Sequence, residues 1–205
     1  MSLTGSLHRT RGTEGRRRAC APFVLTTVPL ADQRLKYALT KLKVSMAFLP
    51  TYVEDVFERS LVALLTTVNE RKEPVTHPML PLYERGSGRI YFTSSLLFSR
   101  KLEHIKRYPK VSVLFSHKEF TRCETGDAVL VKGTASVDDS NPSNGWMRLL
   151  PLWRKKEPYI DAYLRARFAF PLYWERAVIE VVPEVVYVWR GGDMSRDPEV
   201  HDLRR

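Results

Sequence analysis

The pattern of apolar and polar positions becomes regular at about Leu49. Between residues 50 and 60, Val53, Val56 and Phe57 recur at helical spacing, which predicts an amphipathic helix. Short apolar or alternating runs that are rich in β-branched residues and end in polar turns predict strands. We expect these strands within residues 61–68, 74–83, 90–93, 110–116, 126–139 and 175–193.

Prolines and one glycine refine the predicted strands. Pro74, Pro78 and Pro81 exclude a helix from their segment and favour an edge or bulged strand, because proline lacks the N–H group that a central strand needs. Gly133 indicates a bulge or a close backbone approach within its strand. We expect Pro183 to divide the last segment into two strands.

Helices are predicted at three further places. Arg100–Tyr108 has the apolar stripe of a helix, with Ser99 as its N-cap. Two short helices, separated by Pro158, are expected within residues 141–153 and 157–168. Because the strands do not alternate with helices as βαβ units, the pattern predicts a mainly β (α+β) fold: a closed β-barrel with peripheral helices.

The composition is that of an ordinary globular protein, apart from its charge. Of the 205 residues, 43% are hydrophobic and 27% are charged, and no apolar run is long enough to span a bilayer. The formal net charge is +10, but residues 1–45 carry nine Lys and Arg against two Asp and Glu, which leaves only +3 for the remainder. An excess of positive charge favours nucleic acid or an acidic membrane surface as a partner. Because most of this charge lies in residues 1–45, that interpretation is weaker for the rest of the chain.

Residues 1–45 and 46–205 are expected to be organised differently. The first part lacks sustained periodicity, so we interpret it as a basic, flexible N-terminal extension of a single domain, residues 46–205. It combines a positive start with an apolar stretch, as a secretory signal does, but Pro22 and Pro29 interrupt that stretch. Translation from Met46 is an alternative interpretation.

The cysteines and histidines do not form a metal-binding pattern. Cys20 and Cys123 lack the spacing of a zinc site or a disulfide scaffold, which favours a reducing, cytoplasmic location. We expect His104 and His117 at the surface, whereas His77 is either a surface residue or a hydrogen-bonding partner of a bound ligand.

Hydroxyl donors and two cations gather where a predicted strand gives way to a helix. These residues are Thr93, Ser94, Ser95, Ser99, Arg100 and Lys101. Such a helix start favours binding of an anion, especially a phosphate, since the guanidinium offers a planar fork and the ammonium a point charge. An ordinary N-cap followed by solvated cations is the alternative that the residues leave open.

The order of a hairpin, the junction "YFTSSLLFSRKLEHIKRYPKVSVLF" and the strand "VLVKGTAS" resembles the pyridoxamine 5′-phosphate oxidase-like, FMN-binding split-barrel superfamily. The similarity extends from about Thr51 to Gly192, with Lys101, Pro109 and Gly133 among the matching positions. It implies a six-stranded split β-barrel with peripheral helices, which forms a homodimer with FMN at the interface.

The same resemblance implies a set of cofactor-binding residues. Arg100 and Lys101 would hold the FMN phosphate, the segment that begins at Thr76 would run beside the isoalloxazine ring, and Trp189 is either a core residue or a contact of the cofactor. The implied set is Thr76, His77, Pro78, Met79, Phe92, Thr93, Ser99, Arg100, Lys101 and Trp189.

The match to the vitamin B6 enzymes themselves is incomplete. Thr76 stands where those enzymes have an arginine, Pro81 or Leu82 where they have a lysine, and Ala128 where they have a glutamine. The aromatic and basic segment 146–174 is compatible with a lid, a dimer interface or a surface for nucleic acid.

These features predict an FMN-binding, flavin-dependent oxidoreductase of unknown substrate, in which the flavin carries the chemistry and no side chain is nominated as catalytic. The alternatives are a split-barrel reductase that binds the deazaflavin F420, or a non-catalytic barrel that binds flavin or nucleic acid. The expected partners are a second copy of the chain and a small-molecule substrate, rather than nucleic acid or a membrane.

Overall fold

The computed structural model describes residues 49–97, 99–116, 126–169 and 171–204. All of them lie within one compact unit of the chain, Ser45–Arg205. The predicted extension, residues 1–45, lies outside the described residues.

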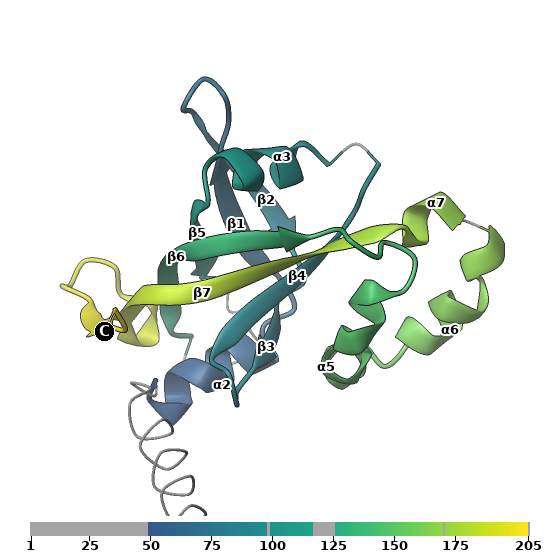
Figure 1. Ribbon diagram of the computed structural model, residues 1–205. Helices are drawn as coiled ribbons and strands as arrows, with labels where there is room; N and C mark the ends of the chain where they lie inside the picture. Colours follow the sequence, from purple (N-terminus) through teal and green to yellow (C-terminus); the bar gives the residue numbers. More distant parts are fainter. Residues whose placement is uncertain (1–48, 98, 117–125, 170, 205) are drawn as a thin grey trace, which may run out of the picture. The chain divides into compact units, whose positions relative to one another are not determined.

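An antiparallel sheet dominates the described part of the chain (Figure 1). The strand order is β2-β1-β5-β6-β7-β4-β3, and β8 pairs with the end of β7. The strands are β1 (Ala63–Val68), β2 (Pro74–Met79), β3 (Leu82–Glu84), β4 (Arg89–Ser95), β5 (Lys110–Phe115), β6 (Ala128–Asp138), β7 (Arg176–Trp189) and β8 (Glu199–Asp202).

Two helices cover the sheet and several short ones form a separate group. They are α2 (Thr51–Arg59), α3 (Arg100–Arg107), then η1 (Gly145–Leu149), α5 (Leu150–Lys156), α6 (Ile160–Arg165), η2 (Arg167–Ala169) and α7 (Pro171–Trp174), and finally η3 (Arg190–Gly192). The elements from η1 to α7 are called the helical lobe below, and Figure 1 shows them beside one end of β7.

The mainly β fold with peripheral helices is confirmed. The described strands curl into an open half-barrel, so the closed barrel that the strand pattern alone predicted was wrong, and the split barrel implied by the family resemblance was right. Six of the described strands have six or more residues, in line with the expected six, and the short strands β3 and β8 are additional. Gly133 lies at the predicted irregularity, since the register between β6 and β7 shifts between Lys132 and Gly133.

The prediction that Pro183 divides its segment was wrong, because β7 continues through it as one strand of 14 residues. Pro183 pairs with Gly133 while Lys132 pairs with Val185, so the proline lies at the bulge, where a missing N–H group is tolerated.

The inner face of the sheet forms the main core with α2 and α3. Alternate residues point inward, as the pairing pattern of a strand requires, and Leu65, Val113 and Phe92 are fully buried. Phe57 of α2 packs edge-on against Tyr83, with ring centroids 5.2 Å apart.

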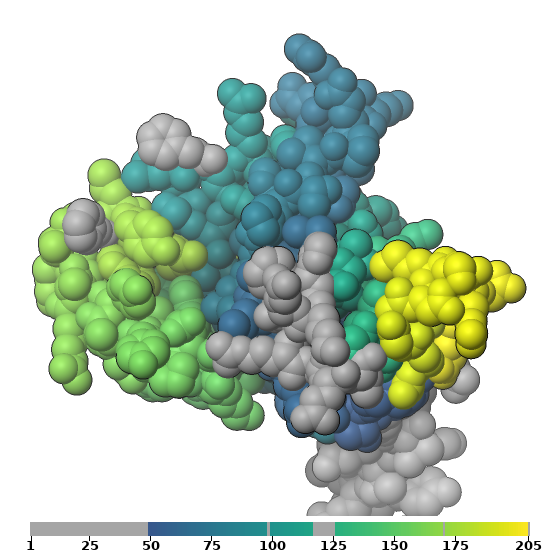
Figure 2. Space-filling model, turned by 180° about the vertical axis from the view of Figure 1, so that it is seen from behind, coloured from purple at the N-terminus to yellow at the C-terminus, as the bar shows by residue number. Residues whose placement is uncertain are grey.

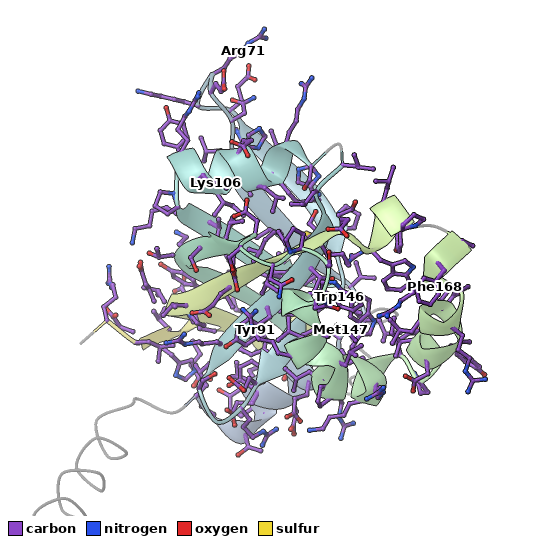
Figure 3. All side chains as sticks on the ribbon, turned by 45° about the vertical axis from the view of Figure 1, so that its right-hand side comes forward. Arg71, Tyr91, Lys106, Trp146, Met147 and Phe168 are labelled. Atoms are coloured by element: carbon purple, nitrogen blue, oxygen red, sulfur yellow. The ribbon has the colours of Figure 1, made fainter. Side chains whose placement is uncertain are left out.

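The helical lobe has its own aromatic core against the outer face of β3, β4 and β7. Trp146 stacks on Trp174 at 5.5 Å, and its indole N–H donates to the Trp174 carbonyl at 3.1 Å. Tyr91 and Val178 supply the sheet side of this cluster. Figure 3 shows Trp146 and Tyr91 in this layer between the lobe and the strands. The position of the lobe relative to the sheet is therefore set by packing.

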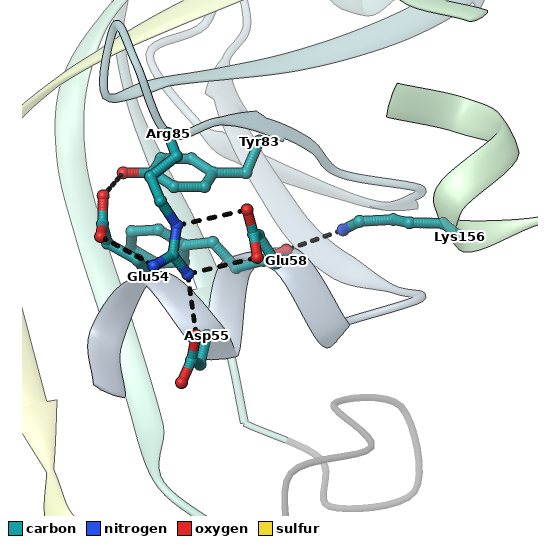
Figure 4. A network of polar contacts seen from close by, with 7 residues as sticks. Glu54, Asp55, Glu58, Tyr83, Arg85 and Lys156 are labelled. Atoms are coloured by element: carbon teal, nitrogen blue, oxygen red, sulfur yellow. Dashed lines mark hydrogen bonds and ion pairs between the residues drawn. The ribbon is translucent and has the colours of Figure 1, made fainter. Parts of the chain in front are cut away.

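Polar contacts, some of them buried, tie α2 to β3 and to the lobe (Figure 4). The Tyr83 hydroxyl donates to Glu54 at 2.7 Å, and Arg85 pairs with Glu54 and Asp55. The buried ammonium of Lys156 donates to two backbone carbonyls at the C-terminal end of α2, each at 2.7 Å. These bonds satisfy carbonyls that a helix end leaves without partners.

Replacing Gly133 with alanine tests the bulge. A Cβ atom at Gly133 would lie 2.3 Å from the Val182 carbonyl oxygen, so Gly133→Ala is expected to lower the free energy of unfolding by about 1–3 kcal/mol. Urea-induced unfolding measures this. Gly86→Ala is the matched control, since nothing lies within 4 Å of its added Cβ. Equal stability of the two variants would contradict the close approach.

Candidate functional site

The sheet leaves a gap between β2 and the second half of β4. β3 pairs with β4 only at residues 89–91, so in the described part of the chain Phe92–Ser95 have a strand partner only on the β7 side. β2 pairs with β1 alone. A cavity of about 430 Å³ opens at this gap, lined by residues of β2, β4, α3, α5, α7 and β7.

Lys101 projects into this cavity among three serines. Its ammonium donates to the hydroxyls of Ser94 and Ser99, at 3.2 Å each, and those two hydroxyl oxygens are 2.7 Å apart. Ser95 also lines the cavity. The N-cap serine of α3 therefore uses its hydroxyl to hold Lys101, and its side chain makes no cap hydrogen bond.

Arg176, the first residue of β7, supplies a second cation. Only 9% of it is exposed. Its Nε donates to the Thr93 hydroxyl at 3.1 Å, its Nη2 to the Thr93 carbonyl at 3.2 Å and its Nη1 to the Tyr173 carbonyl at 3.4 Å. The guanidinium also lies 5.5 Å from the Trp153 ring centroid and 5.1 Å from that of Tyr173. Three of the five N–H groups of an arginine are thereby engaged.

No carboxylate is among the described residues that line the cavity. Burial, and secondarily the charge of Arg176, lowers the pKa of Lys101. Burial likewise lowers the pKa of the Arg176 guanidinium. Burial therefore disfavours both positive charges, and contact with Tyr173 offsets only part of this at Arg176. An anion bound between Lys101 and Arg176 would supply the missing compensation.

His77 faces the same cavity from β2. Its Nε2 is buried and has no hydrogen-bonding partner among the described residues. Burial lowers the pKa of His77, and the positive charge of Lys101 and then His104 lower it further. The imidazole is therefore neutral at pH 7 and offers one unused polar atom beside the cations.

Comparison with solved structures supports the fold, whereas no family model and no curated protein matches the chain. A pyridoxamine 5′-phosphate oxidase-related, FMN-binding protein from Nostoc punctiforme is similar with a TM-score of 0.51 and 11% identity, covering 78% of this chain and 100% of that one. A protein related to general stress protein 26, of the pyridoxinephosphate oxidase family, from Clostridium acetobutylicum has a TM-score of 0.51 and 14% identity, with coverages of 75% and 93%. A conserved hypothetical protein from Mycobacterium tuberculosis has a TM-score of 0.53 and 15% identity, with coverages of 74% and 91%.

The chain has the split-barrel fold of the pyridoxamine 5′-phosphate oxidase-like superfamily. At these identities the likeness establishes the fold alone. The expectation that the resemblance gave for the architecture is thus confirmed, and the site has to be argued from this chain's own residues.

The cavity of the split barrel brings together six of the ten predicted site residues. They are His77, Pro78, Met79, Thr93, Ser99 and Lys101. Their elements are the two strands that border the gap and the start of α3, as the sequence pattern predicted.

The other four predicted residues lie away from this cavity. Thr76 is on the opposite face of β2, where its hydroxyl is 2.9 Å from that of Thr66, and Phe92 is fully buried in the core. Arg100 is exposed and makes no hydrogen bond or ion pair with a described residue. Their proposed contacts with a cofactor stay predictions.

Trp189 is at the far end of β7 from Arg176, about 40 Å away along the strand at 3.3 Å per residue. Its indole N–H donates to the Arg196 carbonyl and its ring stacks on Tyr187. Within one chain it does not reach the cavity.

Sequence reasoning missed Arg176, Trp153 and Tyr173 as cavity residues. The one signal for Arg176 is a charged residue at the start of a long, otherwise largely apolar strand. Its meaning depends on where that strand begins in space, which the sequence pattern does not give.

Two features are absent from the described residues. No group of three or more His, Cys, Asp or Glu side chains is placed to hold a metal ion. Among the helices of the described segments, none is long and apolar enough to cross a membrane.

Inorganic phosphate tests the cavity as an anion site. Phosphate is expected to raise the midpoint of thermal unfolding by a few degrees, because a ligand of the folded state adds RT ln(1 + [L]/Kd) to stability. Lys101→Met should remove at least half of this shift, and Arg100→Met, the neighbouring exposed cation, should leave it unchanged. An equal loss in both variants, or an unchanged shift in Lys101→Met, would contradict this assignment.

Proposed function

We propose that the cavity at the barrel gap binds FMN by its phosphate, and that the protein is a flavin-dependent oxidoreductase. The observation that carries the proposal is a pair of inward-facing cations, Lys101 and Arg176, in a cavity whose described lining residues include hydroxyls and no carboxylate.

The donor set suits a terminal phosphate. Lys101 contributes an ammonium and Arg176 its free N–H groups, while Ser94 and Ser99 contribute hydroxyls that can reorient toward phosphate oxygens. Phosphate ligands are commonly held by such mixed sets of charged and hydroxyl donors, and the lowered pKa values of both cations are then restored. On these grounds the residues fit the group.

The rest of the cavity suits the remainder of the molecule. Met79, Leu80 and Leu97 are apolar lining residues, so a planar ring system near them would be removed from water. His77 offers a neutral Nε2 that can bond a polar atom of the ligand. This chain's own contributions are binding, orientation and exclusion of water.

The charge of the site favours FMN over F420. FMN ends in a phosphate monoester, which carries close to two negative charges above about pH 6. The phosphate of F420 is a diester with a single charge. Two cations, with no carboxylate among the described lining residues, match the doubly charged phosphate of FMN better than the singly charged phosphate of F420.

Bound FMN would supply the redox chemistry by accepting and donating hydride or electrons. In the proposal, Lys101 and Arg176 fix the phosphate end, and the backbone of β2 and the side chain of His77 border the rest of the ligand. No described side chain is assigned the role of general base.

We extend the proposal to a homodimer. Trp189, which the family resemblance implies as a cofactor contact, is about 40 Å from Arg176 along β7, so it would reach a cofactor only from a second copy. The outer sheet face around Tyr187 contains a second cavity of about 440 Å³. A second copy packed against this face is the arrangement that we propose.

Titration with FMN tests the proposed function. Quenching of FMN fluorescence should report saturable binding to the full-length protein, and Lys101→Met should weaken it by about 10-fold to 100-fold, the worth of one charge-assisted hydrogen bond. Arg176→Lys keeps the charge but loses the planar fork, and should weaken binding less. Arg100→Met is the control with unchanged affinity. Saturable binding of F420 without binding of FMN would reverse the choice of cofactor, and binding of neither would overturn the proposal.

The affinity for FMN should depend on pH in a defined direction. It should rise as the phosphate loses its second proton at about pH 6. It should fall again as pH rises through the pKa of Lys101, which burial has lowered in the free protein, because the anion binds the charged ammonium. Lys101→Arg should keep affinity high at alkaline pH, since arginine does not lose its proton there. Identical pH profiles for the wild type and Lys101→Arg would remove Lys101 from the phosphate site.

A further inference from the structure

Exposed apolar side chains are concentrated on the helical lobe. Ten large apolar residues of the described segments are exposed, and seven of these lie on the lobe or directly after β4. The seven are Leu96, Leu97, Tyr159, Tyr163, Phe168, Leu172 and Tyr173. Single exposed apolar residues are ordinary, but a group of this size marks an interaction surface. Figure 2 shows the lobe protruding on one side of the described unit.

The outer face of α6 is apolar where a surface helix is normally polar. Ile160 is buried and Leu164 packs against the lobe core, which accounts for one face. Tyr159, Ala162 and Tyr163 recur at helical spacing on the other face and are exposed. The lobe therefore has an inner apolar face that it uses and an outer one without a partner among the described residues.

Basic residues accompany this surface. Residues 145–174 carry six Lys and Arg against two Asp and Glu in the sequence, of which Lys156 is buried and Arg148 pairs with Asp138. Asp161 is already paired with Arg154 at 2.8 Å. Arg165 and Arg167 form no ion pair with a described carboxylate, and Arg167 lies over the Phe168 ring at 5.0 Å. The charge of the surface fits an anionic partner.

The shape of the surface favours a flat partner over an inserted chain segment. Phe168 is 82% exposed, and Figure 3 shows it on the lobe at a distance from the strands. The cavities described at the barrel gap, at Tyr187 and at Lys156 are not lined by Tyr159, Tyr163 or Phe168. These side chains protrude, so they would enter a partner's surface instead of receiving a side chain from it.

A second copy of the same lobe is disfavoured by charge. A two-fold contact would bring together two copies of a surface that carries more basic than acidic side chains. Like charges so placed repel, and the lobe has too few carboxylates to compensate.

We propose that the outer surface of the helical lobe docks the protein on an anionic phospholipid membrane. Tyrosine, phenylalanine and leucine side chains enter the interface between headgroups and acyl chains, while arginines pair with lipid phosphates. This inference is independent of the identity of the ligand in the cavity.

The expectation of no membrane partner rested on the lack of an apolar run long enough to span a bilayer. Docking at the interface needs no such run. Tyr173 and Leu97 belong both to the exposed surface and to the cavity lining. A docked lobe would therefore hold the cavity mouth beside the lipid.

Vesicle flotation of the full-length protein tests the docking surface. We expect the protein to bind vesicles of phosphatidylcholine that contain about 30% phosphatidylglycerol. Binding to vesicles of phosphatidylcholine alone should be weak. Phe168→Ser with Leu172→Ser should lower the bound fraction on anionic vesicles by about tenfold, because two apolar side chains no longer enter the interface. Arg165→Glu with Arg167→Glu should lower it at least as much.

Met194→Ser with Val200→Ser is the matched control, since these exposed apolar residues lie outside the lobe and should leave flotation unchanged. Thermal unfolding of each variant verifies that the lobe is still folded. Equal flotation of the lobe variants and the wild type would overturn the proposal, as would a loss seen only when Arg16, Arg17 and Arg18 are replaced by alanine. A third outcome is that the protein fails to bind vesicles and instead is retained on DNA, or forms a dimer in light scattering, in a way that depends on Phe168 and Leu172. Either result would overturn the proposal and assign the surface to that other partner.

Discussion

The guanidinium of Arg176 joins three parts of the molecule at one buried point. It donates hydrogen bonds to the hydroxyl and the carbonyl of Thr93 on β4 and to the carbonyl of Tyr173 in the lobe. It also lies against the Trp153 ring. Burying a charge without a counter-ion costs several kcal/mol, even where hydrogen bonds and aromatic rings reduce the cost. The architecture around the gap therefore contains an unbalanced positive charge. Lys101 adds a second one close by, and an anionic ligand is the simplest compensation for both.

The gap itself follows from the sequence of β2. Residues of one parity in a strand direct their N–H groups to one side, and β2 pairs with β1 along its whole length. Pro74 and Pro78 share a parity, so their missing N–H groups must face away from β1, toward the gap. β4 could not add a regular ladder there. The prolines thus keep the barrel split, and the opening becomes available for a ligand.

The main features of the fold and half of the site were accessible from sequence because they depend on local pattern. The edge strand with its prolines, the helix after Ser99 and the position of Lys101 are all local properties of one segment. The role of Arg176 was not accessible from the sequence, because it depends on the pairing of Arg176 with Ser95. These two residues are far apart in the chain. Arg100 is a different case. It is adjacent to Lys101, but successive helical residues point about 100° apart, so only one of the two faces the cavity. The prediction for Pro183 was wrong because the proline lies at the bulge opposite Gly133, where a strand tolerates a missing N–H group.

The most direct test of the account is a crystal structure of the full-length protein grown with FMN. The account predicts that the FMN phosphate lies within hydrogen-bonding distance of both the Lys101 ammonium and the Arg176 guanidinium, with Ser94 and Ser99 as further donors. FMN bound with its phosphate elsewhere, and the space between Lys101 and Arg176 filled by water alone, would contradict it.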